Sequence, residues 1–87
     1  MSDYLSLTYK SIKFIFKFDA LDPTILHIFA RHLIEPDDAI ELFYDENATT
    51  EWNANRCRFE TYSKSRGLFW FWIEENKVVM VISCFNL

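Results

Sequence analysis

Two apolar segments near the end of the chain, residues 68–73 and 78–85, carry hydrophobic side chains on both of the faces that a strand would have. The turn-forming sequence Glu74-Glu75-Asn76-Lys77 separates them. Runs of this kind predict strands buried on both faces of a sheet. We expect one face to be covered by helices, so the other face needs a subunit, a partner or a ligand.

Strict alternation predicts a half-buried strand over residues 11–19. Its apolar side chains fall on one face and two lysines on the other: Ile12, Phe14, Phe16 and Phe18 against Lys13 and Lys17. Residues 5–9 alternate as well, and either extend this strand or pair beside it. Residues 56–62 alternate again and lead into a hairpin loop at residues 63–67. Together with the two apolar segments, this predicts a three-stranded antiparallel meander at the C-terminus.

Two short helices are expected between these strand regions. Asp22-Pro23 has the form of a helix start, because an aspartate caps free N–H groups and a proline lacks the N–H that would be unsatisfied there. This helix should run to about His32. Pro36, followed by two aspartates, opens the second helix, since acids in the first turn complement the helix dipole. The polar residues 45–55 are expected to form a loop.

Length and composition place the chain in the α+β class as one domain spanning residues 1–87. The 87 residues are 51% hydrophobic and include one glycine and two prolines, which excludes a disordered chain. No apolar run approaches the roughly 20 residues that span a membrane. The N-terminus lacks the order of a signal peptide, and Cys57 and Cys84 are expected to be buried free thiols. These features predict a cytoplasmic protein without a metal site or cofactor.

Charge is distributed unevenly along the chain. The net charge is −4, yet the segment from Glu35 to Glu51 contains no lysine or arginine. Its acids are Glu35, Asp37, Asp38, Glu41, Asp45, Glu46 and Glu51. The rest of the chain therefore has a surplus of basic residues, and two interpretations stay open. One is a polarised surface with an acidic helix opposite a mildly basic sheet. The other is an acidic helix face that is simply solvated.

Several short motifs resemble those of one toxin family. Residues 16–19 read F-K-F-D, residues 34–45 read I-E-P-D-D-A-I-E-L-F-Y-D, and residues 82–83 read I-S. With Arg31-His32 and the segment from Arg58 to Leu68, they resemble the BrnT branch of the RelE-like toxins. The resemblance implies a RelE-like fold and metal-independent RNA cleavage by basic side chains. It also implies a small antitoxin protein as partner.

RNA cleavage without a metal needs a base for the 2′-hydroxyl, cations for the phosphate and an acid for the leaving oxygen. Histidine titrates near neutral pH, and the arginine fork matches phosphate. The candidate catalytic residues are therefore His32, Arg31, Arg58 and Arg56, which we expect to converge on one side of the sheet. Further cations are candidates for RNA binding, namely Lys13, Lys17, Lys64 and Arg66.

Each candidate also has a structural alternative. His32 suits a helix C-terminus, Arg58 suits an ion pair with Glu60, and aromatic residues at strand spacing are common in cores. Trp70 and Trp72, or else Phe69 and Phe71, are expected to be exposed in the monomer and to bind an antitoxin or a second copy through the aromatic sheet face.

Catalysis itself remains open at the level of sequence. Residues 82–85 read I-S-C-F and lack the arginine with which the family ends its strand. Two functions are therefore compatible with the sequence. One is a toxin-like domain that binds or cleaves RNA. The alternative is a non-catalytic protein-interaction module that keeps the fold and its partner-binding surface.

Overall fold

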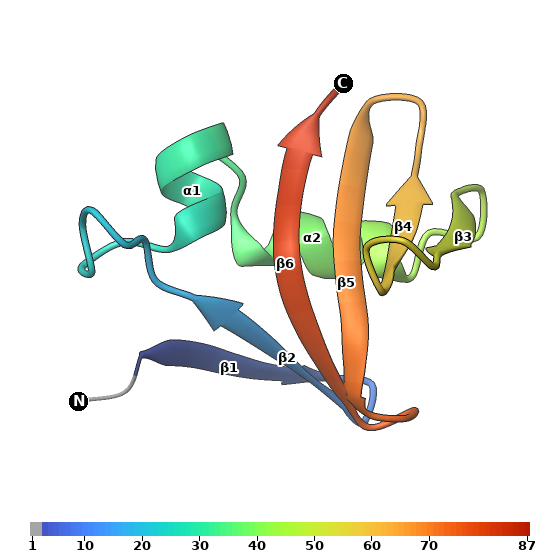
Figure 1. Cartoon of the computed structure of the whole chain (residues 1–87), viewed down its shortest axis with the longest axis horizontal. Helices are drawn as coiled ribbons and strands as arrows, with labels where there is room; N and C mark the ends of the chain where they lie inside the picture. Colours follow the sequence, from blue (N-terminus) through green and yellow to red (C-terminus); the bar gives the residue numbers. More distant parts are fainter. Residues whose placement is uncertain (1–2) are drawn as a thin grey trace.

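A single mixed sheet joins all the strands in the computed structural model, which describes residues 3–87 (Figure 1). Along the chain the elements are β1 (Tyr4–Tyr9), β2 (Ile12–Lys17), α1 (His27–His32), α2 (Pro36–Phe43), β3 (Thr49–Asn53), β4 (Arg58–Tyr62), β5 (Arg66–Glu74) and β6 (Val78–Asn86). In space the strands follow the order β1-β2-β6-β5-β4-β3. Neighbours are antiparallel, except that β2 and β6 run parallel.

The β1–β2 hairpin has a two-residue turn. Lys10 and Ser11 both have left-handed φ angles, 50° and 69°, as a type I′ turn requires. In β2 the alternation predicted from the sequence is confirmed, because Phe14 and Phe16 are each 1% exposed while Lys13 and Lys17 are exposed. The earlier segment forms β1 and pairs with β2 along its whole length.

Parallel pairing of β2 with β6 brings together a strand from the N-terminal part of the chain and the last strand. It covers only residues 78–81 of β6. The helix α1 lies beside the remaining half of β6, where β2 does not reach (Figure 1). Both helices belong to the crossover between these two strands, and α2 passes across β5 and β4 on one face of the sheet.

The first helix begins later than the sequence predicted. Asp22 accepts the backbone N–H of Thr24, as an N-cap would, but the turn that follows does not continue as a helix. Instead the carbonyl of Ile25 accepts the backbone N–H of Asp19, and Leu26 is extended and pairs with Phe18. As a result α1 starts only at His27, and it ends at His32, before Leu33 with its left-handed φ of 57°. The second helix does start at Pro36 as predicted, and there the Asp38 carboxylate accepts the backbone N–H of Glu35 at 3.3 Å.

The core lies between the sheet and α2. Phe43 of α2 contacts Phe14 of β2 at 5.0 Å and Trp70 of β5 at 4.8 Å between ring centroids. Val79 and Val81 of the central strand β6 are 0% and 2% exposed. This packing explains why β5 and β6 are apolar on the face that α2 covers.

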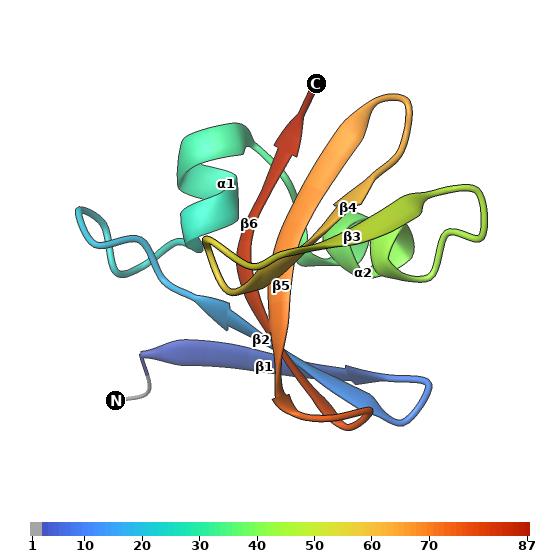
Figure 2. The ribbon, with the colours of Figure 1, turned by 45° about the vertical axis from the view of Figure 1, so that its right-hand side comes forward.

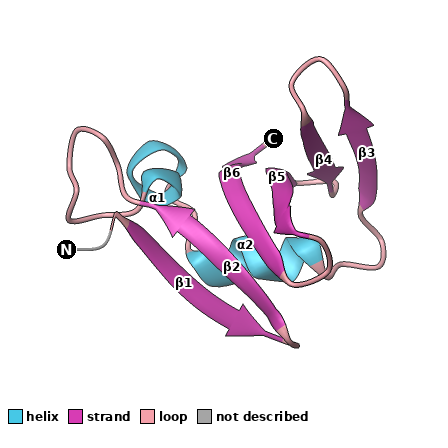
Figure 3. Cartoon of the chain, turned by 60° about the horizontal axis from the view of Figure 1, so that its bottom comes forward, coloured by secondary structure: helices cyan, strands magenta, loops and turns pink. Residues whose placement is uncertain are grey.

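The expected three-stranded meander is wrong, because the sheet has six strands and is mixed. Residues 49–53 were expected to be loop, but they form β3 and pair with β4 (Figure 2). Four of its five residues are exposed. Because β3 is an exposed edge strand, its sequence does not alternate between apolar and polar residues, and the pattern used to predict the other strands is absent. The hairpin β1–β2 lies in the same sheet through a pairing of residues far apart in sequence, which no local pattern encodes (Figure 3).

The start of one strand also differs from the prediction. The strand β4 begins at Arg58, so Arg56 and Cys57 lie in the β3–β4 turn. Cys57 has a left-handed φ of 53° and is exposed, contrary to the expectation of a buried thiol. Cys84 is buried as expected, and burial raises the pKa of its thiol to about 11. Neither helix within residues 3–87 has the length and hydrophobicity needed to cross a membrane.

Candidate functional site

Within residues 3–87, no helix lies over β4, β5 or the adjoining part of β6 on the face of the sheet turned away from α2 (Figure 1). We call this the open face. In β5 the side chains of this face alternate with those of Leu68 and Trp70, which are buried on the other face, and the strand register places the partners in β4 and β6. The central side chains of the open face are those of Arg58 and Tyr62 in β4, Phe69 and Phe71 in β5, and Met80 and Phe85 in β6. All of these side chains are half-buried.

Three rings on the open face pack against one another, and we call this group the aromatic row: Phe69 and Phe85 lie next to each other, and Tyr62 borders both. Phe69 and Phe85 lie edge to face with centroids 4.8 Å apart, and Tyr62 is 6.3 Å from Phe69 and 6.5 Å from Phe85. The chain's one glycine makes room for it. A Cβ on Gly67 would stand 2.5 Å from the Phe85 ring and 3.0 Å from the Tyr62 ring.

Arg58 lies at one end of the row. The centre of its guanidinium is 3.7 Å from the Phe69 centroid, a cation–π contact. Its Nη2 atom is 2.9 Å from Oε2 of Glu60, and its Nε–H donates a hydrogen bond to the same oxygen at 2.9 Å. This hydrogen bond from Arg58 lowers the pKa of Glu60, with a smaller contribution from the amide of Asn53. The expected ion pair of Arg58 with Glu60 is therefore present, and it fixes the arginine flat against a ring.

His32 lies at the other end of the row. Its ring is 6.0 Å from that of Phe85, centroid to centroid, at the last residue of α1. His32 therefore contacts the aromatic row through Phe85, and Arg58 contacts it through Phe69.

The lysine candidates on β2 share the open face. Lys13 and Lys17 alternate with the buried Phe14 and Phe16, so they project on the side away from α2. Arg56 is exposed in the β3–β4 turn, and its charge lowers the pKa of Glu60 slightly. Lys64 is exposed in the turn between β4 and β5.

Two arginine candidates lie away from the aromatic row. Arg66 belongs to the face covered by α2, where its Nη1 is 3.3 Å from Oδ1 of Asp38. Arg31 binds Asp19, with Nε 3.2 Å from Oδ1. The same carboxylate oxygen is 3.4 Å from Nδ1 of His27. Arg31 therefore fastens α1 to the segment that follows β2.

Asp19 is the centre of this second cluster and is 5% exposed. Burial alone would raise its pKa. Hydrogen bonds from the backbone N–H groups of Leu21 and Asp22, together with Arg31 and His27, outweigh burial and lower the pKa of Asp19. The pKa of His27 is lowered, first by burial and then by the charge of Lys17, against the opposing effect of Asp19.

The tryptophans predicted to bind a partner face α2. Trp70 is 6% exposed, donates its indole N–H to Oγ1 of Thr61 at 2.9 Å and stacks on Phe59 at 4.6 Å between centroids. Trp72 is half-buried and lies 6.0 Å from Phe43. On the open face, the alternative pair Phe69 and Phe71 remains partly accessible.

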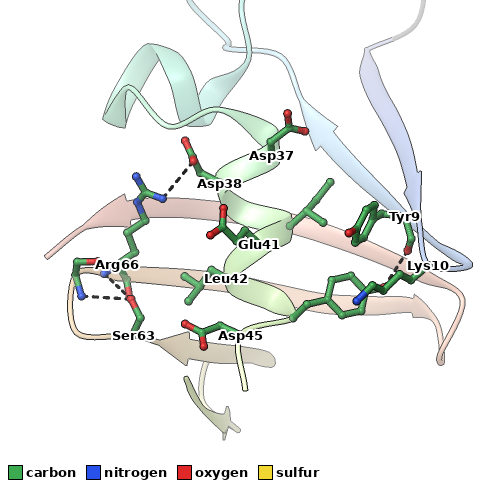
Figure 4. A pocket seen from close by; sticks show the side chains of 12 residues that line it. Tyr9, Lys10, Asp37, Asp38, Glu41, Leu42, Asp45, Ser63 and Arg66 are labelled. Atoms are coloured by element: carbon green, nitrogen blue, oxygen red, sulfur yellow. Dashed lines mark hydrogen bonds and ion pairs between the residues drawn. The ribbon is translucent and has the colours of Figure 1, made fainter. Parts of the chain in front are cut away.

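The side of the sheet that α2 covers is acidic. A hollow of about 810 Å³ runs along α2, with Asp37, Glu41 and Asp45 among its lining residues (Figure 4). Arg66 stands at one end of it, and Lys10 stands at the other, over the Tyr44 ring at 5.1 Å. Four of the seven acids of residues 35–51 line this hollow (Asp37, Asp38, Glu41 and Asp45), whereas Glu51 pairs with Glu60 on the open-face side of the sheet. This placement favours the polarised-surface interpretation of the sequence.

Sequence reasoning missed Tyr62 and Phe85 as surface residues and Asp19 as the partner of Arg31. The single glycine at the start of an apolar strand was a signal for the first two, because a strand glycine often marks a close approach. No group of three or more His, Cys, Asp or Glu side chains within residues 3–87 is placed to bind a metal ion. Comparison with protein families, curated proteins and solved structures finds no match to this chain.

Proposed function

We propose that the open face binds single-stranded RNA. The observation that carries this proposal is the aromatic row of Tyr62, Phe69 and Phe85, with Arg58 stacked at one end and His32 at the other. Bases stack on exposed rings and on arginine planes, and each such stack contributes about 1–3 kcal/mol. Unstacked single strands present the faces that this row would contact.

Charge supports the same assignment. The phosphate backbone requires cations beside the stacking surface, and Lys13 and Lys17 of β2 supply them on the open face. The acids of α2 lie on the opposite side of the sheet, where their negative charge repels RNA from the face that α2 covers. The motif resemblance to BrnT-like toxins supports RNA over DNA as the ligand.

The geometry favours binding over cleavage. Acid–base catalysis needs the catalytic groups within about 3 Å of the atoms that exchange protons. His32 lies against Phe85 and Arg58 lies against Phe69, and Glu60 already occupies one edge of the guanidinium. The missing arginine at the end of β6 agrees with a face that has kept RNA binding without efficient turnover.

The test is binding of a fluorescently labelled single-stranded RNA of about 12 nucleotides, a length within the range covered by known binding platforms. Phe85→Leu keeps an apolar side chain but removes the ring, so affinity should fall about tenfold, the equivalent of one stack. Tyr9→Leu is the matched control, because Tyr9 is half-exposed on the other side of the sheet, beside Tyr44.

The ionic part of the interaction has its own measurement. For the double variant Lys13→Gln/Lys17→Gln, the slope of log affinity against log salt should become shallower by about 1.4, since each phosphate contact on a single strand contributes about 0.7. Lys10→Gln removes a lysine from the other side and should leave the slope unchanged. If all these variants bind RNA alike, or if the wild-type chain binds none, the proposal fails.

A protein-interaction module remains the second candidate, because the acidic hollow along α2 could receive a cationic segment of a partner. Variants on the two sides of the sheet distinguish the two functions. A partner held by α2 would lose affinity on Asp37→Asn/Glu41→Gln and would be indifferent to Phe85→Leu. RNA on the open face should show the reverse.

A further inference from the structure

Within residues 3–87, β1 and β3 form the two edges of the sheet (Figure 3). Exposed edges usually carry charges or prolines that prevent pairing with another chain. The edge strand β3 has Glu51 at its centre, so an antiparallel copy centred on the same residue would place two glutamates opposite each other. The edge strand β1, Y-L-S-L-T-Y, has neither charge nor proline over its six residues.

The hydrogen-bonding direction of β1 follows from its neighbours. The N–H of Lys13 donates to the carbonyl of Lys77, so the odd-numbered residues of β2 bond towards the β6 side. Because bonding alternates along a strand, Phe14 and its neighbours at even positions bond towards β1, where Phe14 pairs with Leu7. It follows that the backbone groups of Ser6 and Thr8 point outward from the sheet, ready to bond another strand.

We propose that two copies of this chain associate through antiparallel pairing of their β1 edges, with Ser6 opposite Ser6 on the twofold axis. Outward-bonding residues must face each other in such a ladder. This register does so and also places Leu5 of one copy opposite Leu7 of the other. Both leucines are half-buried on the side of the sheet that α2 covers, and pairing would complete their burial.

Charge complementarity supports the second copy as the occupant. Asp3 precedes β1 and Lys10 follows it, so an antiparallel pair brings opposite charges together at both ends. The proposed register sets Asp3 opposite Tyr9 of the other copy. The ammonium of Lys10 lies over that Tyr9 ring, 5.6 Å from its centroid, which leaves it beside the incoming carboxylate. This inference is independent of RNA binding.

The first experiment measures the oligomeric state by sedimentation velocity over a wide range of protein concentration. The wild-type chain should show a reversible monomer–dimer equilibrium. Ser6→Lys should abolish the dimer, because it places two lysines face to face on the axis. The matched control Thr49→Lys adds the same charge to the exposed start of the opposite edge strand β3 and should leave dimerisation unchanged. Mixing Ser6→Lys with Ser6→Asp should restore a heterodimer.

The second experiment tests the register by cross-linking in a Cys57→Ser background, which removes the exposed native thiol. Facing residues of a hydrogen-bonded pair have Cα atoms about 5.5 Å apart, within the range that a disulfide bridges. Ser6→Cys should form a covalent dimer under mild oxidation, whereas Thr8→Cys should not, since it faces Tyr4. A chain that stays monomeric at every concentration overturns the proposal. So does a dimer that persists in Ser6→Lys and disappears in Phe71→Ser.

Discussion

At the scale of single residues, Gly67 determines the shape of the aromatic row. Its φ is not in the left-handed region, so the requirement for glycine there is one of space. The Phe85 ring lies where a Cβ would stand, and Tyr62 borders the same position. A strand glycine usually weakens a sheet because it contributes no side chain. Here the missing side chain lets two rings close over the strand.

Replacement of this glycine should therefore affect the open face more than the fold. In Gly67→Ala the new methyl group displaces the outer end of the Phe85 ring, and we expect RNA affinity to fall about tenfold, as one stack is lost. Near-ultraviolet circular dichroism should change with it. Ser65→Ala, in the adjoining exposed turn, is the control. Unchanged affinity in Gly67→Ala would mean that RNA does not use this end of the row.

At the scale of elements, α1 is too short to be stable by itself, since its six residues give less than two turns. Packing of Ile28 holds it from one side, and the Asp19 cluster holds it from the other. Asp19 joins the end of β2 to the helix through Arg31 and His27, and it also closes the turn at Leu21 and Asp22. Loss of its charge should loosen the whole crossover.

Asp19→Asn should therefore lower the free energy of unfolding at pH 7. The folded protein lowers the pKa of this carboxyl, so its contribution is present above the ordinary value of about 3.9 and is lost as the pH falls through the folded value. Denaturant titrations at pH 7 and pH 3 should show a deficit at neutral pH that shrinks in acid. Asp37→Asn, at an exposed position on α2, should show a smaller deficit. Equal deficits in both variants at pH 7 would contradict the role of Asp19.

The elements differ in how far the sequence specified them. The strand β2 and the start of α2 were predictable, because a period of two and a proline followed by acids are local signals. The strand β3 was not predictable, since an edge strand with polar faces needs no apolar alternation. The start of α1 was misplaced because the bond from Thr24 to Asp22 is the same in a helix cap and in an isolated turn, whereas the pairing of Leu26 with Phe18, which keeps Leu26 out of the helix, is not visible in the local sequence.

In the candidate site, too, contacts between neighbours in sequence were predictable and contacts between distant residues were not. That Arg58 and Glu60 would pair was predictable from their spacing on one strand face. The binding of Arg31 to Asp19 spans 12 residues and depends on how the crossover folds back, so the pattern around Arg31 gave no sign of it. The row itself needs β4, β5 and β6 in register, and Tyr62, Gly67 and Phe85 meet only through that pairing.

At the scale of the whole molecule, the sheet separates two surfaces of opposite character. The acidic α2 and its hollow lie on one side, and the aromatic row with the lysines of β2 lies on the other. Antiparallel pairing through β1 keeps corresponding faces on the same side, so a dimer would present two open faces in one direction. A longer RNA could then contact both copies, which would raise its affinity through effective concentration.

The last prediction concerns catalysis, and it follows from the partners that His32 and Arg58 have on the open face. We expect the purified chain to bind single-stranded RNA without cleaving it at any pH from 6 to 8, whether the RNA is free or ribosome-bound. The imidazole of His32 lies against Phe85, whereas the guanidinium of Arg58 lies against Phe69 and is bonded to Glu60, an arrangement that favours stacking over joint action on one phosphate. End-labelled RNA incubated with excess protein and resolved on a denaturing gel should stay intact. His32→Ala and Arg58→Ala should then differ from wild type only in affinity. Cleavage that disappears in both variants, with a pH–rate profile that His32→Ala flattens near neutrality, would instead establish a composite active site.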